Sequence, residues 1–388
     1  MSSYLIRGGQ VYDGSGEAPA ALDVRIEDSL IQEMGPGLQP DGAQIVDATG
    51  LIVSPGLIDL HSHVFSEMGL FSIDFAEAGL KRGVTTLLDT GSAGALAYPV
   101  FHHYIIPRAT EDIFALLNIS QIGVCGHPRV EPFLGDLHEI RYLHVPSAVE
   151  CVRKFPGRIL GTKVRLTSDL AEGRTENEWA GLNGAIEVAR QTDLPCMIHH
   201  SRSKVPLADV LRALQPGDIY THMYHPHYDH GFADDSGAPQ DVMHEARQRG
   251  IIFDVGHGVG SFGWNVAEGA CQQHDFWPDT ISTDIHKFNL HGPVFDLTTT
   301  MSKFLHLGMP LEKVIRATTL EPARAMRLSD RFGRLAPGRP ADVTLLRLVR
   351  GSFGLIDVKQ QERVASERLV AVMAFKNGQR SDCVQDEI

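Results

Sequence analysis

Two histidines separated by one residue, His61 and His63, end an apolar stretch with the sequence LIVSPGLIDLHSHV over residues 51–64. Side chains of a β-strand point alternately to its two faces, so residues at i and i+2 share a face. Two neutral imidazoles on one face of a strand end can chelate a metal ion such as zinc. The alternative is a pair of partly buried polar residues, because so short a motif often arises by chance.

The composition limits which kinds of protein this chain can be. Of its 388 residues, 43% are hydrophobic and 21% are charged, as is typical of a globular protein. The formal net charge of −13 argues against nucleic acid or an anionic membrane surface as the main partner. A small-molecule substrate is compatible with this charge, even an anionic one, because a bound metal ion dominates the field around it.

The cysteines and the N-terminal residues predict where the protein works. The five cysteines are scattered and form no C-x-x-C pair, which is typical of a reducing compartment. The N-terminal residues lack the basic start and apolar core of a signal peptide. No apolar run is long enough to span a bilayer. We therefore expect a cytoplasmic protein without membrane association.

The order of strand and helix patterns predicts the fold. Strand-like runs separated by Gly, Asp and Pro fill the first 54 residues. Strand and helix patterns then alternate about eight times, which is the rhythm of a (β/α)8 barrel. Beyond residue 330 the pattern returns to strands. The sequence predicts a TIM barrel over 55–330 and one small β-sandwich domain built from both chain termini, residues 1–54 and 331–388.

Further metal-ligand candidates fall at the ends of the predicted barrel strands, where barrel enzymes carry their chemistry. These candidates are Lys163, His199, His200, His222 and Asp284. Each has a structural alternative, such as a lysine paired with an acid inside the barrel, a loop histidine, or an acid that caps a helix. Because adjacent strand residues face opposite ways, only one of His199 and His200 can point into the barrel.

The order H-x-H, Lys, His, His, Asp resembles that of the metal-dependent amidohydrolase superfamily. The start SPGLIDLHSH and the ending EPARAMRLSDRFGRLAPGRPADVTLL resemble members with a flanking sandwich. The segments KVRL, DVGHGVGSF and ISTDIHKFNLHGPVFDLTTTMSKFLHLGMPLEKVI are similar to a branch of deacetylases and dihydroorotase-like proteins. That branch includes esterases acting on acetylated (R)-mandelate. The resemblance covers nearly the whole chain, and its motifs are specific for the superfamily rather than for a substrate.

The resemblance implies a site for two divalent metal ions, usually zinc. The implied ligands are His61, His63 and Asp284 for the more buried ion, His199 and His222 for the second, and Lys163 as the bridge. A plain lysine is a poor ligand, because its reference pKa of about 10.4 keeps it protonated at neutral pH. The family converts this lysine to a bridging carboxylate by carbamylation with carbon dioxide, so a carbamylated Lys163 is implied here.

Four further residues are candidates for substrate contact: Tyr224, His257, His286 and Arg174. Tyr224 lies in the polar stretch 223–237 after a predicted strand, and such loops line barrel active sites. His257 lies between two glycines, which would let a substrate approach the backbone. The alternative for each is a structural or surface role.

The expected activity is metal-dependent hydrolysis of an ester or amide acyl bond in a small acetylated carboxylic acid. Asp284 is the expected catalytic residue, because a carboxylate can carry a proton from the attacking water to the leaving group. One alternative is a cyclic amidase of the dihydroorotase kind, in which Arg129, Arg165 or Arg202 would hold the substrate carboxylate. Another is a metal-free binding scaffold. A homo-oligomer is expected by analogy with the family alone.

Overall fold

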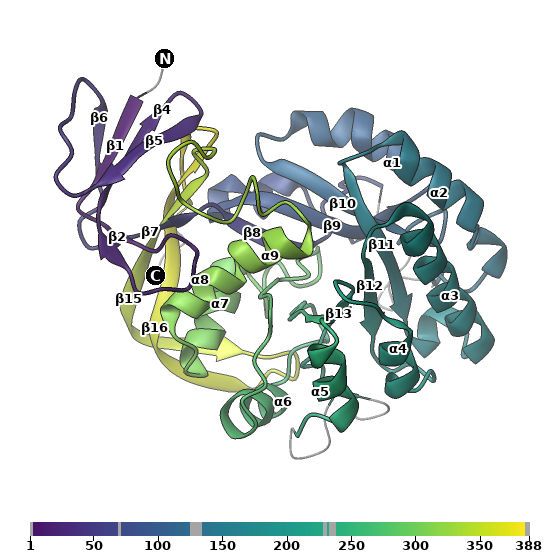
Figure 1. Cartoon of the computed structure of the whole chain (residues 1–388). Coiled ribbons are helices and arrows are strands. Elements are labelled where there is room, and N and C mark those ends of the chain that lie inside the picture. The colour runs from purple at the N-terminus through teal and green to yellow at the C-terminus, as the bar shows by residue number, and fades with distance from the viewer. Residues whose placement is uncertain (1–2, 69–70, 125–133, 228–230, 233–237, 385–388) are drawn as a thin grey trace.

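The computed structural model describes residues 3–68, 71–124, 134–227, 231–232 and 238–384. Its largest sheet is parallel and curls into a barrel wall, with helices on its outer side (Figure 1). The strands, in the spatial order β14-β13-β12-β11-β10-β9-β8, are β8 (Leu57–Ser62), β9 (Val84–Gly94), β10 (Asp112–Asn118), β11 (Ile159–Leu166), β12 (Cys196–His200), β13 (Ile219–Thr221) and β14 (Ile252–Phe253).

An irregular segment, residues 280–285, closes the barrel between the first and last strands of this sheet. Asp254, just after β14, forms a parallel bridge with Thr280, and Ser62 of β8 forms one with Ile285. The backbone N–H of His63 also donates to the carbonyl of Ile285 at 3.1 Å. The predicted (β/α)8 barrel is therefore confirmed, and its eighth position is filled by extended chain rather than by a regular strand.

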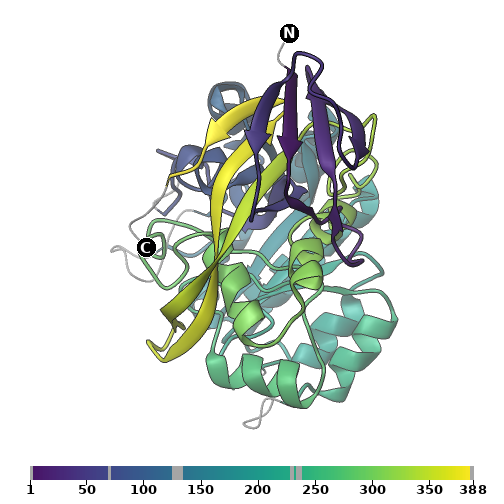
Figure 2. The same ribbon diagram turned by 90° about the vertical axis from the view of Figure 1, so that its left-hand side faces the viewer.

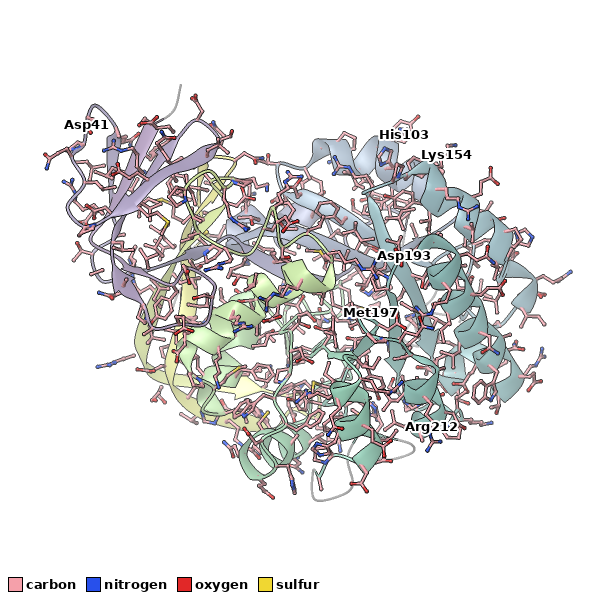
Figure 3. The ribbon with its side chains drawn as sticks, viewed as in Figure 1. Asp41, His103, Lys154, Asp193, Met197 and Arg212 are labelled. Carbon is pink, nitrogen blue, oxygen red and sulfur yellow. The ribbon has the colours of Figure 1, made fainter. Side chains whose placement is uncertain are left out.

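Amphipathic helices cover the outside of the barrel, as the alternating sequence pattern predicts. They are α1 (Tyr98–Val100), α2 (Val145–Lys154), α3 (Thr175–Thr192), α4 (Leu207–Ala213), α5 (Asp241–Gln248), α6 (Trp264–Glu268), α7 (Leu297–His306), α8 (Leu311–Ala317) and α9 (Leu320–Ala325). The strand residue Met197 is fully buried, whereas Lys154 and Arg212 lie on the outer helices (Figure 3). No helix in the described ranges is long and apolar enough to cross a membrane.

The two ends of the chain form the predicted sandwich. One sheet has the order β5-β4-β1-β6 and the other β17-β16-β15-β7-β2-β3. The strands are β1 (Ser3–Arg7), β2 (Gln10–Val11), β3 (Ala20–Ala21), β4 (Asp23–Glu27), β5 (Leu30–Gly35), β6 (Gln44–Asp47), β7 (Ile52–Pro55), β15 (Val343–Ile356), β16 (Glu362–Lys376) and β17 (Gln379–Asp382). N-terminal Val24 and Val53 share a hydrophobic core with C-terminal Val343 and Phe375. The boundaries at residues 54 and 331 stay a prediction.

The hairpin of β15 and β16 extends well beyond the sandwich. Its strands contain 14 and 15 residues, and it runs along the side of the barrel (Figure 2). The backbone N–H of Leu369 donates to the Ser302 hydroxyl of α7 at 2.9 Å. At the tip between the two strands, the backbone N–H of Val358 donates to the Phe262 carbonyl at 3.2 Å, so the tip also contacts the barrel.

One hydrophobic cluster fills the barrel interior at the end covered by α9. It joins the strand residues Ile58, Leu116 and Met197 to Ala323 of α9 and to Phe332. Buried polar and ionisable residues gather instead at the carboxyl ends of the strands. The fold therefore separates a hydrophobic end of the barrel from a polar end, and only the polar end can support chemistry.

Candidate metal centre

Three ligand-type side chains meet at the polar end of the barrel. The Nε2 atoms of His61 and His63 lie 3.4 and 3.0 Å from Oδ1 of Asp284. Each of the three residues is buried and offers one ligand atom, and these atoms all lie within 4.8 Å of one another. The Asp284 N–H donates to the His61 carbonyl at 2.6 Å, so the segment that closes the barrel also delivers the carboxylate.

An irregularity in β8 changes which side chains at the end of this strand point into the barrel. Ile58 and Leu60 belong to the interior hydrophobic cluster, and regular alternation from them would turn Ser62 inward. The pairing of β8 with β9 shifts register between Asp59 and Ser62. Such a shift re-aims the following side chains. His61 and His63 consequently share the polar end of the barrel, although the residues before them fill its apolar core.

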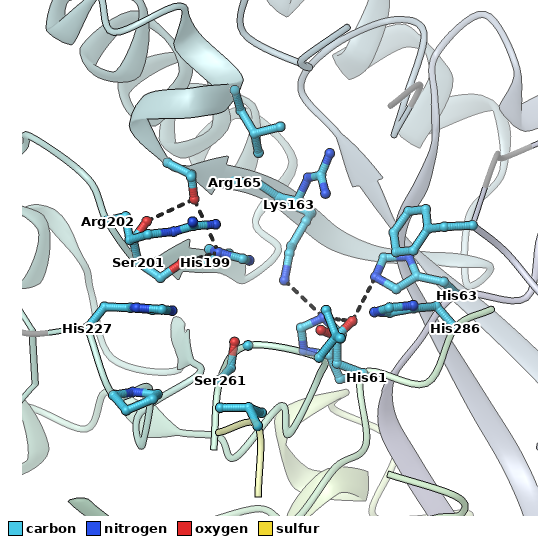
Figure 4. Close-up of a pocket in the computed structure, with 18 of the residues that line it drawn as sticks. His61, His63, Lys163, Arg165, His199, Ser201, Arg202, His227, Ser261 and His286 are labelled. Atoms are coloured by element: carbon cyan, nitrogen blue, oxygen red, sulfur yellow. Dashed lines mark hydrogen bonds and ion pairs between the residues drawn. The ribbon is translucent and has the colours of Figure 1, made fainter. Parts of the chain in front are cut away.

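Lys163, His199 and His222 adjoin this group, and each comes from a different strand end. Nζ of Lys163 lies 3.3 Å from Nε2 of His61. The ring of His222 lies 4.9 Å from that of His61 and 4.1 Å from that of His199, measured between centroids. Figure 4 shows Lys163 pointing between His199 on one side and His61 on the other. The structure thus brings all six predicted ligands into one cluster.

Hydrogen bonds to Nδ1 hold the rings of three histidines and leave their Nε2 atoms for the site. Nδ1 of His61 lies 3.0 Å from the Thr221 hydroxyl, and Nδ1 of His63 lies 2.9 Å from that of Ser92. Nδ1 of His222 lies 2.6 Å from the carbonyl oxygen of Gly256, so it must carry the proton that it donates. Fixing one ring nitrogen in this way sets the tautomer and prepares the other nitrogen to bind a metal ion.

A buried nitrogen without a partner supports the metal interpretation directly. Nε2 of His222 is inaccessible to solvent and has no hydrogen-bond partner among the described atoms. A buried polar atom left in this state costs free energy unless something binds it. Since Nδ1 of the same ring carries the proton, Nε2 presents a lone pair. A metal ion is the partner that this lone pair and its neighbouring histidines fit.

His199 and His200 point in different directions, as strand alternation predicts. His199 lines the cavity, and its Nε2 is held by the hydroxyls of Ser201 at 2.7 Å and Thr167 at 3.3 Å. Its Nδ1 is therefore the ring nitrogen that could bind an ion. His200 turns away and places its Nε2 2.8 Å from the carbonyl oxygen of Val205.

Burial favours the neutral forms of the histidines and the lysine among the candidate ligands. It lowers the pKa of His63 and of His222 to about 3, and it lowers the pKa of His61 and His199 well below the usual value. Burial also lowers the pKa of Lys163 to about 7. Neutral imidazoles are the form that binds metals, and a neutral amine is the form that reacts with carbon dioxide.

Three buried acidic side chains support the candidate ligands through hydrogen bonds. They were not among the residues predicted from the sequence. Asp254 accepts hydrogen bonds from the hydroxyls of Thr221, Thr280 and Ser282 at 2.7–2.8 Å. Asp89 accepts from the backbone N–H of Ser92, whose hydroxyl contacts His63. Asp59 accepts from Thr283, next to Asp284, and from the backbone N–H of His61. The signal for all three was available as an acid inside an otherwise apolar strand pattern.

Two glycines make room for the ligands. A Cβ atom on Gly256 would lie 2.3 Å from the Thr221 hydroxyl and 2.8 Å from Nδ1 of His222. A Cβ atom on Gly258 would lie 2.5 Å from Oδ2 of Asp284. Both glycines also have a positive φ. From the sequence, these glycines predict space for a substrate, whereas in the structure they accommodate the side chains of the site itself.

Five of the six candidate ligands, all but His222, line a cavity of about 340 Å³. Its lining includes His286, one of the four residues predicted to contact a substrate. It also includes Arg165 and Arg202, two of the three arginines considered for holding a carboxylate. Arg165 is committed to Asp136 through two bonds of 2.6 and 2.7 Å. Arg129, the third arginine, falls outside the described residues.

The other three substrate-contact candidates do not belong to the described lining of this cavity. Tyr224 is fully buried, and its hydroxyl donates to the Phe276 carbonyl at 3.1 Å. His257 is fully buried against Lys303, at 2.6 Å from Nε2 to Nζ. Arg174 precedes α3 and forms a half-exposed ion pair with Glu172. Each therefore has a structural partner away from the ligands.

Comparison with known proteins places this site in a family. The model of the amidohydrolase family matches residues 52–380. A deacetylase from Agrobacterium fabrum is 35% identical over 89% of this chain and 83% of its own length. Among solved structures, one described as a dihydroorotase is 30% identical with a TM-score of 0.88, covering 99% of this chain and 98% of its own. One described as an adenine deaminase is 27% identical with a TM-score of 0.89, covering 98% and 100%. Because both the family model and a relative above 30% identity span most of its length, this chain belongs to the amidohydrolase family of metal-dependent hydrolytic enzymes.

Proposed function

We propose that this protein hydrolyses the ester or amide acyl bond of a small acetylated carboxylic acid. An O-acetyl 2-hydroxy acid such as acetyl-(R)-mandelate and an N-acetyl amino acid are the leading candidates. The observation that carries the proposal is the cluster of six ligand-type side chains at one end of the barrel, five of which line one cavity, in a chain similar to a protein named deacetylase. A cavity of about 340 Å³ suits a small molecule.

The residues of the site fit two divalent ions, and the imidazole-rich donor set favours zinc. The first ion would be held by His61, His63 and Asp284, the second by His199 and His222, and a carbamylated Lys163 would bridge them. When bound, such ions supply Lewis-acid polarisation of the acyl carbonyl and acidify a water molecule. The unpartnered Nε2 of His222 is the atom of this chain that most directly supports the second ion.

Asp284 is the residue that we propose for proton transfer. Its side chain is buried but retains 13% exposure, and it lines the cavity. Oδ1 lies between the Nε2 atoms of His61 and His63, so the carboxylate is held where a reacting group would bind. It can accept the proton of the attacking water and pass it to the departing oxygen or nitrogen. An amide requires this proton more than an ester does, because an amide anion is a very poor leaving group.

The test is hydrolysis across a small panel with protein produced in added zinc and bicarbonate. The panel contains O-acetyl 2-hydroxy acids and N-acetyl amino acids of both hands, together with dihydroorotate, and metal content is measured on the same sample. Turnover of an acetylated acid that a chelator abolishes is the expected result. Full metal loading with no turnover of any acetylated acid would overturn the proposal.

The same panel decides between the proposal and its alternatives. A cyclic amidase is favoured by the structural match to a dihydroorotase and would hydrolyse dihydroorotate instead. Arg165 is an unsuitable carboxylate ligand for such a substrate, because Asp136 already occupies its guanidinium group. A metal-free binding scaffold would contain no stoichiometric metal. The complete set of ligands argues against that reading.

A further inference from the structure

Three residues that carry or can carry positive charge line the cavity away from the metal ligands. They are Arg202, after β12, His227, after β13, and Lys359, in the tip between β15 and β16. Figure 4 shows Arg202 and His227 across the cavity from His63 and His286. Two of the three residues come from barrel loops, whereas Lys359 comes from the terminal sandwich.

The charge of the cavity is opposite to that of the whole chain. The chain has a net charge of −13, yet the described lining contains four Lys or Arg side chains and one carboxylate, Asp284. Lys163 lies among the candidate ligands, where burial lowers its pKa to about 7, and the guanidinium group of Arg165 binds Asp136. A concave surface with this charge attracts anions and concentrates them.

Arg202 is available to exchange partners. Its nearest described acid is Asp169, 3.5 Å away, and each of the two side chains is 51% exposed. Ion pairs of this kind contribute little free energy, because water screens both charges. A substrate carboxylate inside the cavity would be shielded from water more than Asp169 is. It would therefore compete for the guanidinium group.

The tip that carries Lys359 is fixed against the barrel. Buried Asp357 accepts hydrogen bonds from the backbone N–H groups of Lys359 and Gln361, both at 2.8 Å, and of Trp264 at 3.0 Å. The Val358 N–H donates to the Phe262 carbonyl at 3.2 Å. The backbone at Lys359 is thus ordered before any substrate binds. This lowers the entropy that recognition costs.

His227 lies near both cations. Burial lowers its pKa, and the positive charges of Arg202 and Lys359 lower it further. The neutral form of the ring is therefore favoured, so it adds no third charge beside the two cations. Its Nε2 would lie 3.8 Å from a Cβ atom on Gly260, so this ring nitrogen faces the far wall of the cavity.

We propose that Lys359 and Arg202 bind the carboxylate of the substrate, and that the terminal sandwich therefore determines specificity through its hairpin tip. This inference rests on the proposed function, because it assumes that the acyl bond lies at the metal ligands. The acetyl group then faces His61 and His63, and the acid portion of the same molecule extends toward the rim. Neutral esters and amides of the same size lack the group that these two cations recognise.

The first experiment compares an acetylated 2-hydroxy acid with its methyl ester, which is neutral. In Lys359→Met, the ratio of kcat/KM for the acid over kcat/KM for the ester should fall about tenfold, mainly through KM, because one charge-assisted contact is lost. Lys359→Arg should keep the ratio. Lys313→Met removes the same charge from an exposed lysine of α8, and it should also keep the ratio.

The second experiment does not depend on turnover. Calorimetric titration of the metal-loaded protein with (R)-mandelate and with mandelamide measures the preference for a carboxylate at equilibrium. Wild type should prefer mandelate, Lys359→Met should lose about tenfold of that preference, and a double variant with Arg202→Gln should lose more. Unchanged preference in both variants would overturn the inference. If wild type hydrolyses no acetylated substrate but the variants lose the preference, the proposed function fails and the carboxylate site stands.

Discussion

Two lysines of the described part of the barrel, Lys163 and Lys303, are fully buried, but they differ in their hydrogen-bond partners. Burial lowers the pKa of both Lys163 and Lys303 to about 7. Nζ of Lys303 has three acceptors, namely Nε2 of His257 at 2.6 Å and the carbonyls of Pro293 at 3.0 Å and Ile356 at 2.6 Å. Nζ of Lys163 lies 3.3 Å from His61 Nε2 and has no oxygen acceptor among the described residues.

The difference separates a lysine held by hydrogen bonds from one that is a candidate for carbamylation. Lys303 of α7 connects the loop after β14 to the end of β15, so its hydrogen bonds hold the hairpin on the barrel. A buried polar group with a full set of partners stabilises one arrangement. Lys163 lines the cavity beside a histidine lone pair, where an added carboxylate group would gain ligands instead of losing hydrogen bonds. The contrast teaches that burial alone does not identify a functional lysine, whereas the supply of acceptors does.

The largest effect should follow from removing the candidate for carbamylation. Lys163→Met should lower kcat/KM for an acetylated acid by several orders of magnitude and reduce bound metal, because Lys163 is the residue proposed to bridge the two ions. Metal content by mass spectrometry and steady-state kinetics check this. Lys303→Met is the matched control and should retain its metal. Equal metal loss in both variants would contradict the comparison.

Asp284→Asn should have the next largest effect. The amide cannot accept a proton, so kcat should fall about 10²–10⁴-fold for an acetylated substrate. The oxygen of the asparagine can still face His61 and His63, and bound metal should remain close to the wild-type content. Kinetics and metal analysis of the same preparation provide the measurement. A nearly normal kcat would remove Asp284 from proton transfer and leave it as a ligand only.

The sequence predicted the barrel and the positions of its ligands because both depend on local pattern. The ends of predicted strands located His61 and Lys163, alternation allowed only one of His199 and His200 to point inward, and the family resemblance selected His199. The eighth barrel position was harder to predict from the sequence, because residues 280–285 pair with both neighbouring strands without forming a regular strand. Its role is defined by contacts with β8, more than 200 residues earlier in the chain.

The substrate-contact predictions depended on neighbours in sequence, and the structure shows why that is insufficient. His257 was chosen for its flanking glycines, yet its ring stacks on Phe262 at 4.8 Å and contacts Lys303. Lys359 was not considered, because it lies about 75 residues beyond Asp284 in the C-terminal sheet. Only the length and docking of the β15–β16 hairpin bring it to the cavity. Such long-range placement has no signature in a single sequence.

The lowered pKa of Lys303 should make the free energy of unfolding depend on pH. The pKa of Lys303 is about 7 in the folded protein and about 10.4 in an unfolded chain. Between these values the unfolded state binds more protons, so the contribution of Lys303 makes the folded state more stable as pH rises. The free energy of unfolding of wild type relative to Lys303→Met should therefore increase by about 2–4 kcal/mol from pH 7 to pH 10. Denaturant titrations at several pH values measure it, and a flat difference would refute the lowered pKa of Lys303.

The smallest effect is expected for Tyr224, whose buried hydroxyl has hydrogen-bond partners, as Nζ of Lys303 does. The Tyr224 hydroxyl donates to the Phe276 carbonyl at 3.1 Å and lies 3.2 Å from Sγ of Cys271. Tyr224→Phe removes this donor and leaves a buried carbonyl without its partner, which should cost about 1 kcal/mol of unfolding free energy. Metal content and KM should not change, because the ring lies outside the described lining of the cavity. Chemical denaturation and kinetics check both parts, and a raised KM with unaltered stability would instead return Tyr224 to the substrate site.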